Sequence, residues 1–214
     1  MDGPGVAALA NYGFAQAASK LGFPYAFYRP VSATAMLTGL AAYKTSPVAL
    51  YMDERFIKPQ GYGRNVWLAY FDGVGVQGAD ILVGADKTLF IAALDPIVSR
   101  QVVECNATVS ISRGACPQGI GAQPYNATTP ATQTPIAAGV PASMIRSGVG
   151  REVRSLLPGD TTHGQFDCYL PILPGGVQVD IRDIIVNDAG ERYVVATNEL
   201  TDMGWRLQVI RQFV

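Results

Sequence analysis

The residues best suited to catalysis lie close together in one segment, which contains Asp160, His163, Asp167 and Cys168. His163 is the single histidine of the chain, and a histidine can activate a nearby cysteine or serine as a nucleophile. An enzyme built on this segment would be a small hydrolase that uses Asp160, His163 and Asp167. Such a site also needs an orienting group and an oxyanion site, and no surrounding motif supplies them. We therefore interpret His163 as an exposed loop residue and expect no catalytic residues and no enzymatic activity.

The cysteines do not indicate a metal site. The chain has three of them, Cys105, Cys116 and Cys168, and they lack the CxxC spacing of a zinc site. Cys105 and Cys116 are near enough in sequence for a disulfide across a loop, but a sparse, odd count is more typical of reduced, buried thiols. Residues 150–160 contain glycines but lack the Gly-Lys-Ser/Thr of a phosphate-binding loop. The sequence therefore predicts no metal and no other cofactor.

An internal repeat gives the strongest structural signal. Residues 73–94 match residues 176–197 without a gap, so that DILV recurs as DIIV and FIAA recurs as YVVA. In the second copy, residues 187–190 (NDAG) are typical of a hairpin turn. Because one hairpin cannot bury its apolar face alone, two copies predict two small β domains. The gapless match predicts four pairs of equivalent positions: Ile81 and Ile184, Val83 and Val186, Phe90 and Tyr193, and Ala92 and Val195.

Two aspartates, Asp80 and Asp183, occupy the same position of this repeat, directly before an apolar strand. One interpretation is a pair of catalytic carboxylates, which would have to lie side by side. The other is that each aspartate enters its own strand on the solvent side of a separate domain. We favour the second interpretation, because the repeat describes architecture and brings no chemistry with it.

The composition favours a subunit that is partly covered by neighbours. Of the 214 residues, 15% are charged and 49% are hydrophobic, and the formal net charge is −1. Ordinary domains carry about 25% charged residues, so we expect part of this surface to meet other subunits. The charge balance gives no footprint for direct, sequence-specific binding of nucleic acid. No apolar run approaches the roughly 20 residues of a membrane span, so we expect no membrane partner.

The first 22 residues carry helix signals at both ends. Asp2 and Pro4 suit the start of a helix, and Gly22 and Pro24 suit its end. The apolar stripe of this helix contains Val6, Ala10, Phe14, Ala17 and Leu21. Residues 23–30 (FPYAFYRP) follow as an aromatic, extended segment between prolines. Aromatic clusters of this kind are more often anchors or core than ligand platforms.

The sequence predicts a mainly β protein of tandem, duplicated small β-barrel or sandwich domains with an N-terminal α-helix. Residues 101–112 alternate well and are expected to form one strand that closes the first domain. The segment SPVA at 46–49 recurs as TPIA at 134–137, which predicts a duplicated first strand. The predicted parts are the N-terminal helix and aromatic extended arm (1–43), the first β domain (44–113), a Gly/Pro/Thr-rich linker (114–130) and the second β domain (131–214).

Two stretches of the chain carry a further pattern. The ending has the form D-[IV]-[IV]…G-x-x-Y-x-[VI], from Asp183 to Val195, followed by a strand of the form W-x-L-x-[VA] that begins at Trp205. The beginning has a helix, then Tyr-Arg-Pro at 28–30, then a β unit with Trp67 and Phe-Asp-Gly at 71–73. Together these stretches resemble small β-barrel proteins of tailed-phage and prophage neck and tail modules. No catalytic motif comes with the resemblance.

The resemblance implies a virion structural protein that forms a ring in the phage neck, in the collar or head-to-tail connection. It would be made in the host cytoplasm and reside in the virion, and its partners would be other copies of itself and neighbouring neck or tail proteins. The alternatives are a structural component of the phage tail end or baseplate, and a ligand-binding module of tandem β-barrels. We expect contacts from residues outside the barrels, namely Phe14, Leu21, Phe23, Tyr25, Phe27, Tyr28 and Arg29.

Overall fold

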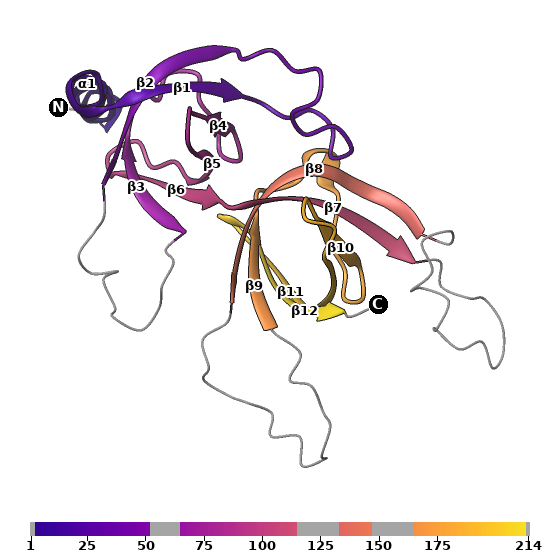
Figure 1. Ribbon diagram of the computed structural model, residues 1–214. Coiled ribbons are helices and arrows are strands. Elements are labelled where there is room, and N and C mark those ends of the chain that lie inside the picture. Colours follow the sequence, from indigo (N-terminus) through magenta and orange to yellow (C-terminus); the bar gives the residue numbers. More distant parts are fainter. Residues whose placement is uncertain (1–2, 52–64, 115–132, 147–164, 213–214) are drawn as a thin grey trace, which may run out of the picture.

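The computed structural model describes residues 3–51, 65–114, 133–146 and 165–212. These residues form two closed six-stranded β-barrels in tandem, with a single long helix beside the first barrel (Figure 1). The prediction of a mainly β protein with duplicated domains and an N-terminal helix is therefore confirmed. The helix is α1 (Gly3–Leu21), and a short 3-10 turn, η4 (Pro174–Gly176), lies in the second barrel.

Both barrels have the same strand order, which is β1-β2-β3-β6-β5-β4 in the first and β7-β8-β9-β12-β11-β10 in the second. The strands of the first barrel are β1 (Phe23–Tyr28), β2 (Lys44–Tyr51), β3 (Val66–Tyr70), β4 (Ile81–Val83), β5 (Thr88–Ala93) and β6 (Arg100–Cys105). Those of the second are β7 (Ala107–Gly114), β8 (Gln133–Arg146), β9 (Gln165–Leu170), β10 (Ile184–Asn187), β11 (Arg192–Thr201) and β12 (Gly204–Gln212). The duplication thus extends over the whole barrel and is not confined to the hairpin.

The prediction of an aromatic arm outside the barrels is wrong, because residues 23–28 form strand β1 of the first barrel. This strand pairs with β2 through Phe23 and Val48 and with β4 through Phe27 and Leu82. Tyr25 and Phe27 point into the barrel while Pro24 and Ala26 do not, so the segment alternates as a barrel strand should. All these residues are apolar, which hides the alternation in the sequence.

The boundary between the barrels lies at Asn106, whereas the sequence placed it after residue 113. The single strand predicted at 101–112 is divided there, so that β6 closes the first barrel and β7 opens the second. The Asn106 side chain donates to the Met144 carbonyl at 2.8 Å and accepts from the Met144 N–H at 2.7 Å. Its amide therefore bonds to β8 as a peptide group would, and it holds the chain where it crosses between barrels.

The first strand pairs are also duplicated, but not in the predicted register. In the first barrel Pro24 lies opposite Pro47, and in the second Thr108 lies opposite Pro141. The counterpart of Pro47 is therefore Pro141, and the predicted match to Pro135 is wrong. Pro135 instead lies opposite Ser112, beyond the irregularities on both sides of Ile111 in the β7–β8 ladder. The predicted linker begins with Gly114, which ends β7, and its residues 115–130 lie outside the described residues.

The repeated hairpins differ by one residue in their turns. The Gly84 N–H bonds to the Lys87 carbonyl in the first turn, whereas the Asn187 N–H bonds to the Glu191 carbonyl in the second. The second turn is one residue longer and contains Gly190 at a φ of 77°. The predicted pairs Ile81/Ile184 and Val83/Val186, which precede the turn, are confirmed.

The two predicted pairs that follow the turn are wrong by one position. The N–H of Ile91 bonds to Asp80 and that of Val195 bonds to Asp183, so the offset is 104 (195 − 91) after the turn and 103 (183 − 80) before it. Phe90 therefore corresponds to Val194, and Ala92 to Ala196. In a strand, a shift by one residue moves a side chain to the opposite face.

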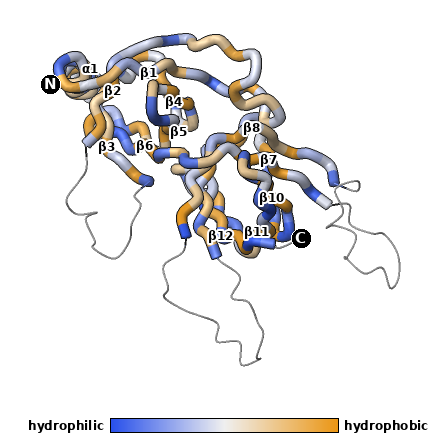
Figure 2. Tube along the Cα trace, in the orientation of Figure 1, coloured by the Kyte–Doolittle hydropathy of each residue, from blue (hydrophilic) through white to orange (hydrophobic). Residues whose placement is uncertain are grey.

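The apolar side chains form two clusters. One fills the first barrel and includes Phe27, Leu82 and Ile91. The other fills the second barrel and extends to residues of the first, including Met36, Ile81 and Phe90. The backbone N–H of Ala138 also donates to the carbonyl of Ala33 at 2.8 Å. The two barrels therefore pack directly on each other, and apolar stretches recur along the strands of both (Figure 2).

Candidate interaction surface

Three of the seven predicted contact residues belong to the packing of the first barrel. Phe27 is fully buried and Tyr25 is nearly so. Phe14, on α1, stacks on Tyr70 of β3 with the ring centroids 5.2 Å apart. Each of the three packs within its own subunit, so none of them is a freely exposed contact residue.

Two further predicted contact residues serve the interior of the chain. Arg29 donates from Nε and Nη2 to the two carboxylate oxygens of Asp80, at 2.9 and 2.7 Å. Tyr28 is half-buried and packs against the cluster that joins the barrels. Both side chains are partly engaged within the subunit, and their role in an intersubunit contact stays a prediction.

The other two, Leu21 and Phe23, are exposed. Leu21 ends α1 and is 73% exposed, and Phe23 begins β1 and is 76% exposed. Leu9 and Tyr12 of α1 are exposed as well. The exposed apolar side chains near α1 are thus found on its outer side, at its last residue and at the start of β1. We call these four residues the α1–β1 surface.

The inner side of α1 is held by a buried arginine, Arg100. Its guanidinium lies between the rings of Phe14 and Phe71, with Cζ 5.0 and 4.6 Å from their centroids. Nη2 donates to Asn11 Oδ1 on α1 at 2.6 Å, and Nη1 donates to the carbonyl of Phe71. Burial lowers the pKa of Arg100, while the nearby Asp72 carboxylate opposes this change.

Asn11 extends the same network to the loop after β3. Its Oδ1 accepts the Gly73 N–H at 2.8 Å, and its Nδ2 donates to Asp72 at 3.1 Å. The helix is thus fixed to its own barrel by polar bonds and aromatic stacking on one side. Only its opposite side is free to meet another protein.

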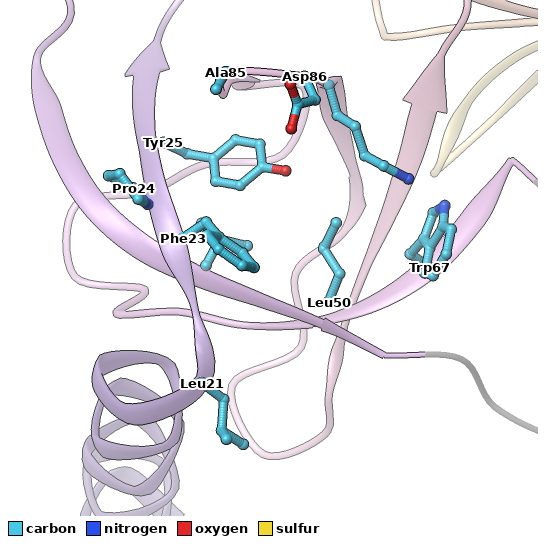
Figure 3. A pocket seen from close by; sticks show the side chains of 10 residues that line it. Leu21, Phe23, Pro24, Tyr25, Leu50, Trp67, Ala85 and Asp86 are labelled. Atoms are coloured by element: carbon cyan, nitrogen blue, oxygen red, sulfur yellow. The ribbon is translucent and has the colours of Figure 1, made fainter.

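A pocket of about 320 Å³ opens beside the α1–β1 surface (Figure 3). It lies at the lower end of the roughly 300–1,000 Å³ range of small-ligand sites. Its walls are mostly apolar and come from α1, β1, β2, β3 and the β4–β5 turn. The residues used below are Leu21, Phe23, Tyr25, Leu50, Trp67 and Lys87.

One wall of the pocket is fixed by a charged cluster. Lys87 Nζ lies 4.4 Å from the centroid of the Trp67 ring and 2.8 Å from Glu104 Oε2. Trp67 Nε1 donates to the same Glu104 oxygen at 2.7 Å. The Trp67 ring is thereby held in one orientation at the side of the pocket.

The floor of the pocket contains the hydroxyl of Tyr25. The Tyr25 ring packs against Gly84, where a β-carbon would come within 2.6 Å of the ring, so a side chain there would displace it. The Tyr25 hydroxyl points into the pocket and has no hydrogen-bond partner among the described residues (Figure 3). Burial raises the pKa of Tyr25, so the hydroxyl is a neutral donor.

The sequence predicted Asp80 on the solvent side of its strand. This prediction is wrong, because Asp80 is buried. Besides Arg29, its carboxylate accepts the Tyr43 hydroxyl at 2.6 Å and the Gln77 N–H at 2.8 Å. Arg29 also donates to the Gly75 carbonyl at 2.7 Å. The pair therefore ties the loop that precedes β4 to the end of β1.

The second barrel repeats this arrangement around Asp183, which is also buried. Arg113 donates from Nε and Nη2 to the two Asp183 oxygens at 2.9 and 2.8 Å, and from Nη2 to the Gln178 carbonyl at 2.9 Å. The Asp180 N–H completes the set at 2.7 Å. The two aspartates are structural ion-pair partners in separate barrels and do not form a carboxylate pair.

The residues considered for catalysis are only partly described. Asp160 and His163 lie outside the described residues, and Asp167 lies on β9. Cys168 is fully buried, and burial raises the pKa of its thiol to about 12, so it is a neutral core residue and not a nucleophile. Cys105 is a free thiol whose pKa is also raised by burial, and Cys116 lies outside the described residues.

In the described part of the chain, no group of three or more potential metal ligands occurs. None of the helices described is both long and apolar enough to cross a membrane. Comparisons with protein-family models, curated proteins and solved structures found no match to this chain.

Proposed function

We propose that this chain is a tailed-phage virion structural protein that forms a ring in the phage neck, in the collar or head-to-tail connection, and has no catalytic role. The observation that carries the proposal is the exposed α1–β1 surface with Leu9, Tyr12, Leu21 and Phe23. The position in the neck rests on the sequence resemblance of the closing hairpin and last strand. The partners are further copies of the chain and neighbouring neck or tail proteins.

The composition of α1 supports an assembly role. Its 19 residues include a single charged side chain, Lys20. An ordinary surface helix carries polar and charged residues on its outer side, and one that is apolar all round is normally covered. Because Leu9 and Tyr12 lie on the outer side and are exposed, a partner is the natural cover for them.

The closed barrels limit how assembly can occur. A sheet with free edges can add strands from another chain, but closure removes those edges. Contacts between copies of the chain must therefore be made by side chains and loops, and the α1–β1 surface offers four exposed apolar side chains for them. A place at the tail end or baseplate would use the same chemistry and differ only in the neighbouring ring.

A second candidate function is favoured by one observation, the pocket with the unpartnered Tyr25 hydroxyl. A tandem-barrel module could bind an apolar ligand there, with the hydroxyl as the orienting group. We rank it second, because the pocket opens at the exposed apolar surface and can equally receive a side chain of another subunit.

The test is the copy number of the chain in purified virions, measured by quantitative mass spectrometry. The wild-type chain is expected at a fixed copy number per virion. Phe23→Asp is expected to lower this copy number at least about tenfold, as for loss of an interface hot spot. Val31→Asp is the matched control, since Val31 is equally exposed but lies outside the α1–β1 surface. Absence of the wild-type chain from virions would refute the proposal.

Point variants are preferable to removal of α1. Deleting the helix would strip Phe14 from Tyr70 and Asn11 from the buried Arg100. Loss of assembly would then follow from damage to the first barrel as well as from loss of the contact. Equal thermal unfolding of wild type, Phe23→Asp and Val31→Asp shows that only the surface has changed.

The enzyme alternative is addressed by His163→Ala. Because we assign His163 no chemical role, this variant is expected to leave virion incorporation and infectivity within about twofold of wild type, the range of a neutral surface change. Infectivity per particle and copy number are the measurements. Normal incorporation combined with a large loss of infectivity would instead support a chemical role for the histidine.

A further inference from the structure

We infer that the pocket of the first barrel receives Ile97 and Val98 from the β5–β6 loop of a second copy of this chain. The inference rests on the proposed function of a self-assembling subunit and names the two surfaces that would join. The incoming group is a pair of aliphatic side chains on a rigid turn, and the receiving group is an apolar pocket with one hydroxyl donor. The contact is direct and needs no cofactor.

The β5–β6 loop presents these two side chains in a fixed geometry. Ile97 is 51% exposed and Val98 is 60% exposed, and they are the only consecutive pair of exposed large apolar residues in the described parts of the chain. Asp95 Oδ1 accepts the N–H of Ile97 at 2.7 Å and of Val98 at 2.9 Å. The turn is thus ordered in advance, which reduces the entropy lost on binding.

The pocket is a feature of the first barrel and does not follow from the barrel fold. In the strand register the counterpart of Tyr25 is Val109, because Phe27 and Ile111 pair with the equivalent residues Leu82 and Ile185. The second barrel therefore has no hydroxyl at this position. A nearly buried Tyr25 whose hydroxyl faces an apolar pocket is suited to a main-chain carbonyl on the incoming turn.

Charge complementarity gives the contact a direction. Asp95, beside the aliphatic pair, forms no ion pair with any described residue, and its two backbone hydrogen bonds lower its pKa and keep it charged. Lys20 directly precedes Leu21 at one end of the pocket and is likewise unpaired within the described segments. Figure 3 shows Asp86 at the other end, so the turn is expected to enter with Asp95 on the Leu21 side.

The two surfaces are different parts of one chain, so the contact joins unlike patches. Contacts of this type propagate from copy to copy and close into a ring when the rotation allows it. Each copy then uses its pocket towards one neighbour and its turn towards the other. This is the geometry that a ring subunit requires.

The experiment measures self-association by sedimentation velocity over a range of protein concentrations. Phe23→Asp changes the pocket and Val98→Asp changes the turn, and each alone is expected to weaken self-association at least about tenfold. In an equimolar mixture one contact is intact, between the turn of the Phe23→Asp chain and the pocket of the Val98→Asp chain. The mixture is therefore expected to form dimers and nothing larger, while Val31→Asp should associate as wild type does.

A direct check uses two further variants, Phe23→Cys and Val98→Cys. An equimolar mixture of these two should form an intermolecular disulfide between residues 23 and 98, and neither variant alone should form it. If the mixture stays monomeric, or if either single variant associates as wild type does, the inference is wrong. The same holds if wild type is monomeric at every concentration. The proposed function is judged separately, since wild-type chain in virions at a fixed copy number would sustain it even if this pairing failed.

Discussion

Ile185→Asp is expected to lower the free energy of unfolding by about 4–5 kcal/mol, the upper range for single substitutions. Ile185 is fully buried in the second barrel and lies between Ile111 and Tyr193 in the sheet. The aspartate would lose the apolar contacts and place a carboxylate inside the apolar cluster of the second barrel. Urea unfolding followed by circular dichroism measures the change.

Ile181→Asp is the matched control, because the residue types are the same and only burial differs. Ile181 lies in the loop before β10 and is 56% exposed, so its substitution should change stability by less than about 0.5 kcal/mol. Equal losses for both variants would show that Ile185 is not in a packed core. The second barrel would then not be closed as described.

The fold was predictable where one face of a segment is apolar and the turn is short. The hairpins around Asp80 and Asp183 keep similar residues at similar spacing, so their shared origin was visible in the sequence. The segment at 23–28 was not recognised as a barrel strand, since both of its faces are apolar. Its only polar side-chain atoms are the hydroxyls of Tyr25 and Tyr28. Its inward residues, Tyr25 and Phe27, were consequently assigned to a contact surface.

The single residue added in the second turn shows the limit of gapless alignment. The letters FIAA and YVVA match well, but Phe90 and Tyr193 are not equivalent. Phe90 pairs with Ile81 and packs from the first barrel against the second, whereas Tyr193 pairs with Ile185 and packs within the second barrel. Apolar strands buried on both faces tolerate such a slip in the sequence, because either register leaves apolar residues inside. Only the hydrogen bonds of the turn decide between the two registers.

The ion pairs that tie each barrel together were missed for a related reason. Arg29 and Asp80 are 51 residues apart, whereas Arg113 and Asp183 are 70 apart. The difference comes from the connections between strands, whose lengths are not shared by the two barrels. A search for a fixed spacing therefore finds the aspartates but not their arginines. Of the predicted contact residues, Leu21 and Phe23 are the two that the fold leaves exposed.

Arg113→Met is expected to destabilise the protein by about 3 kcal/mol, because it leaves the buried Asp183 carboxylate without its cation. Arg113 supplies two of the bonds to Asp183, and the Asp180 N–H alone cannot replace them. The methionine keeps most of the aliphatic length, so the lost charge and donors dominate the change. Urea unfolding at neutral pH measures it.

The double variant Arg113→Met/Asp183→Leu separates the pair from its surroundings. Removing both charges takes away the orphaned carboxylate, so the double variant should be more stable than Arg113→Met alone by at least about 1 kcal/mol. Arg206→Met is the surface control, because Arg206 and Glu199 are both exposed and 4.0 Å apart, and its effect should stay below about 0.5 kcal/mol. If the two arginine variants lose equal stability, Asp183 is reached by water in the folded chain. The ion pair would then be a surface contact, and the loop before β10 would be held by its backbone bonds alone.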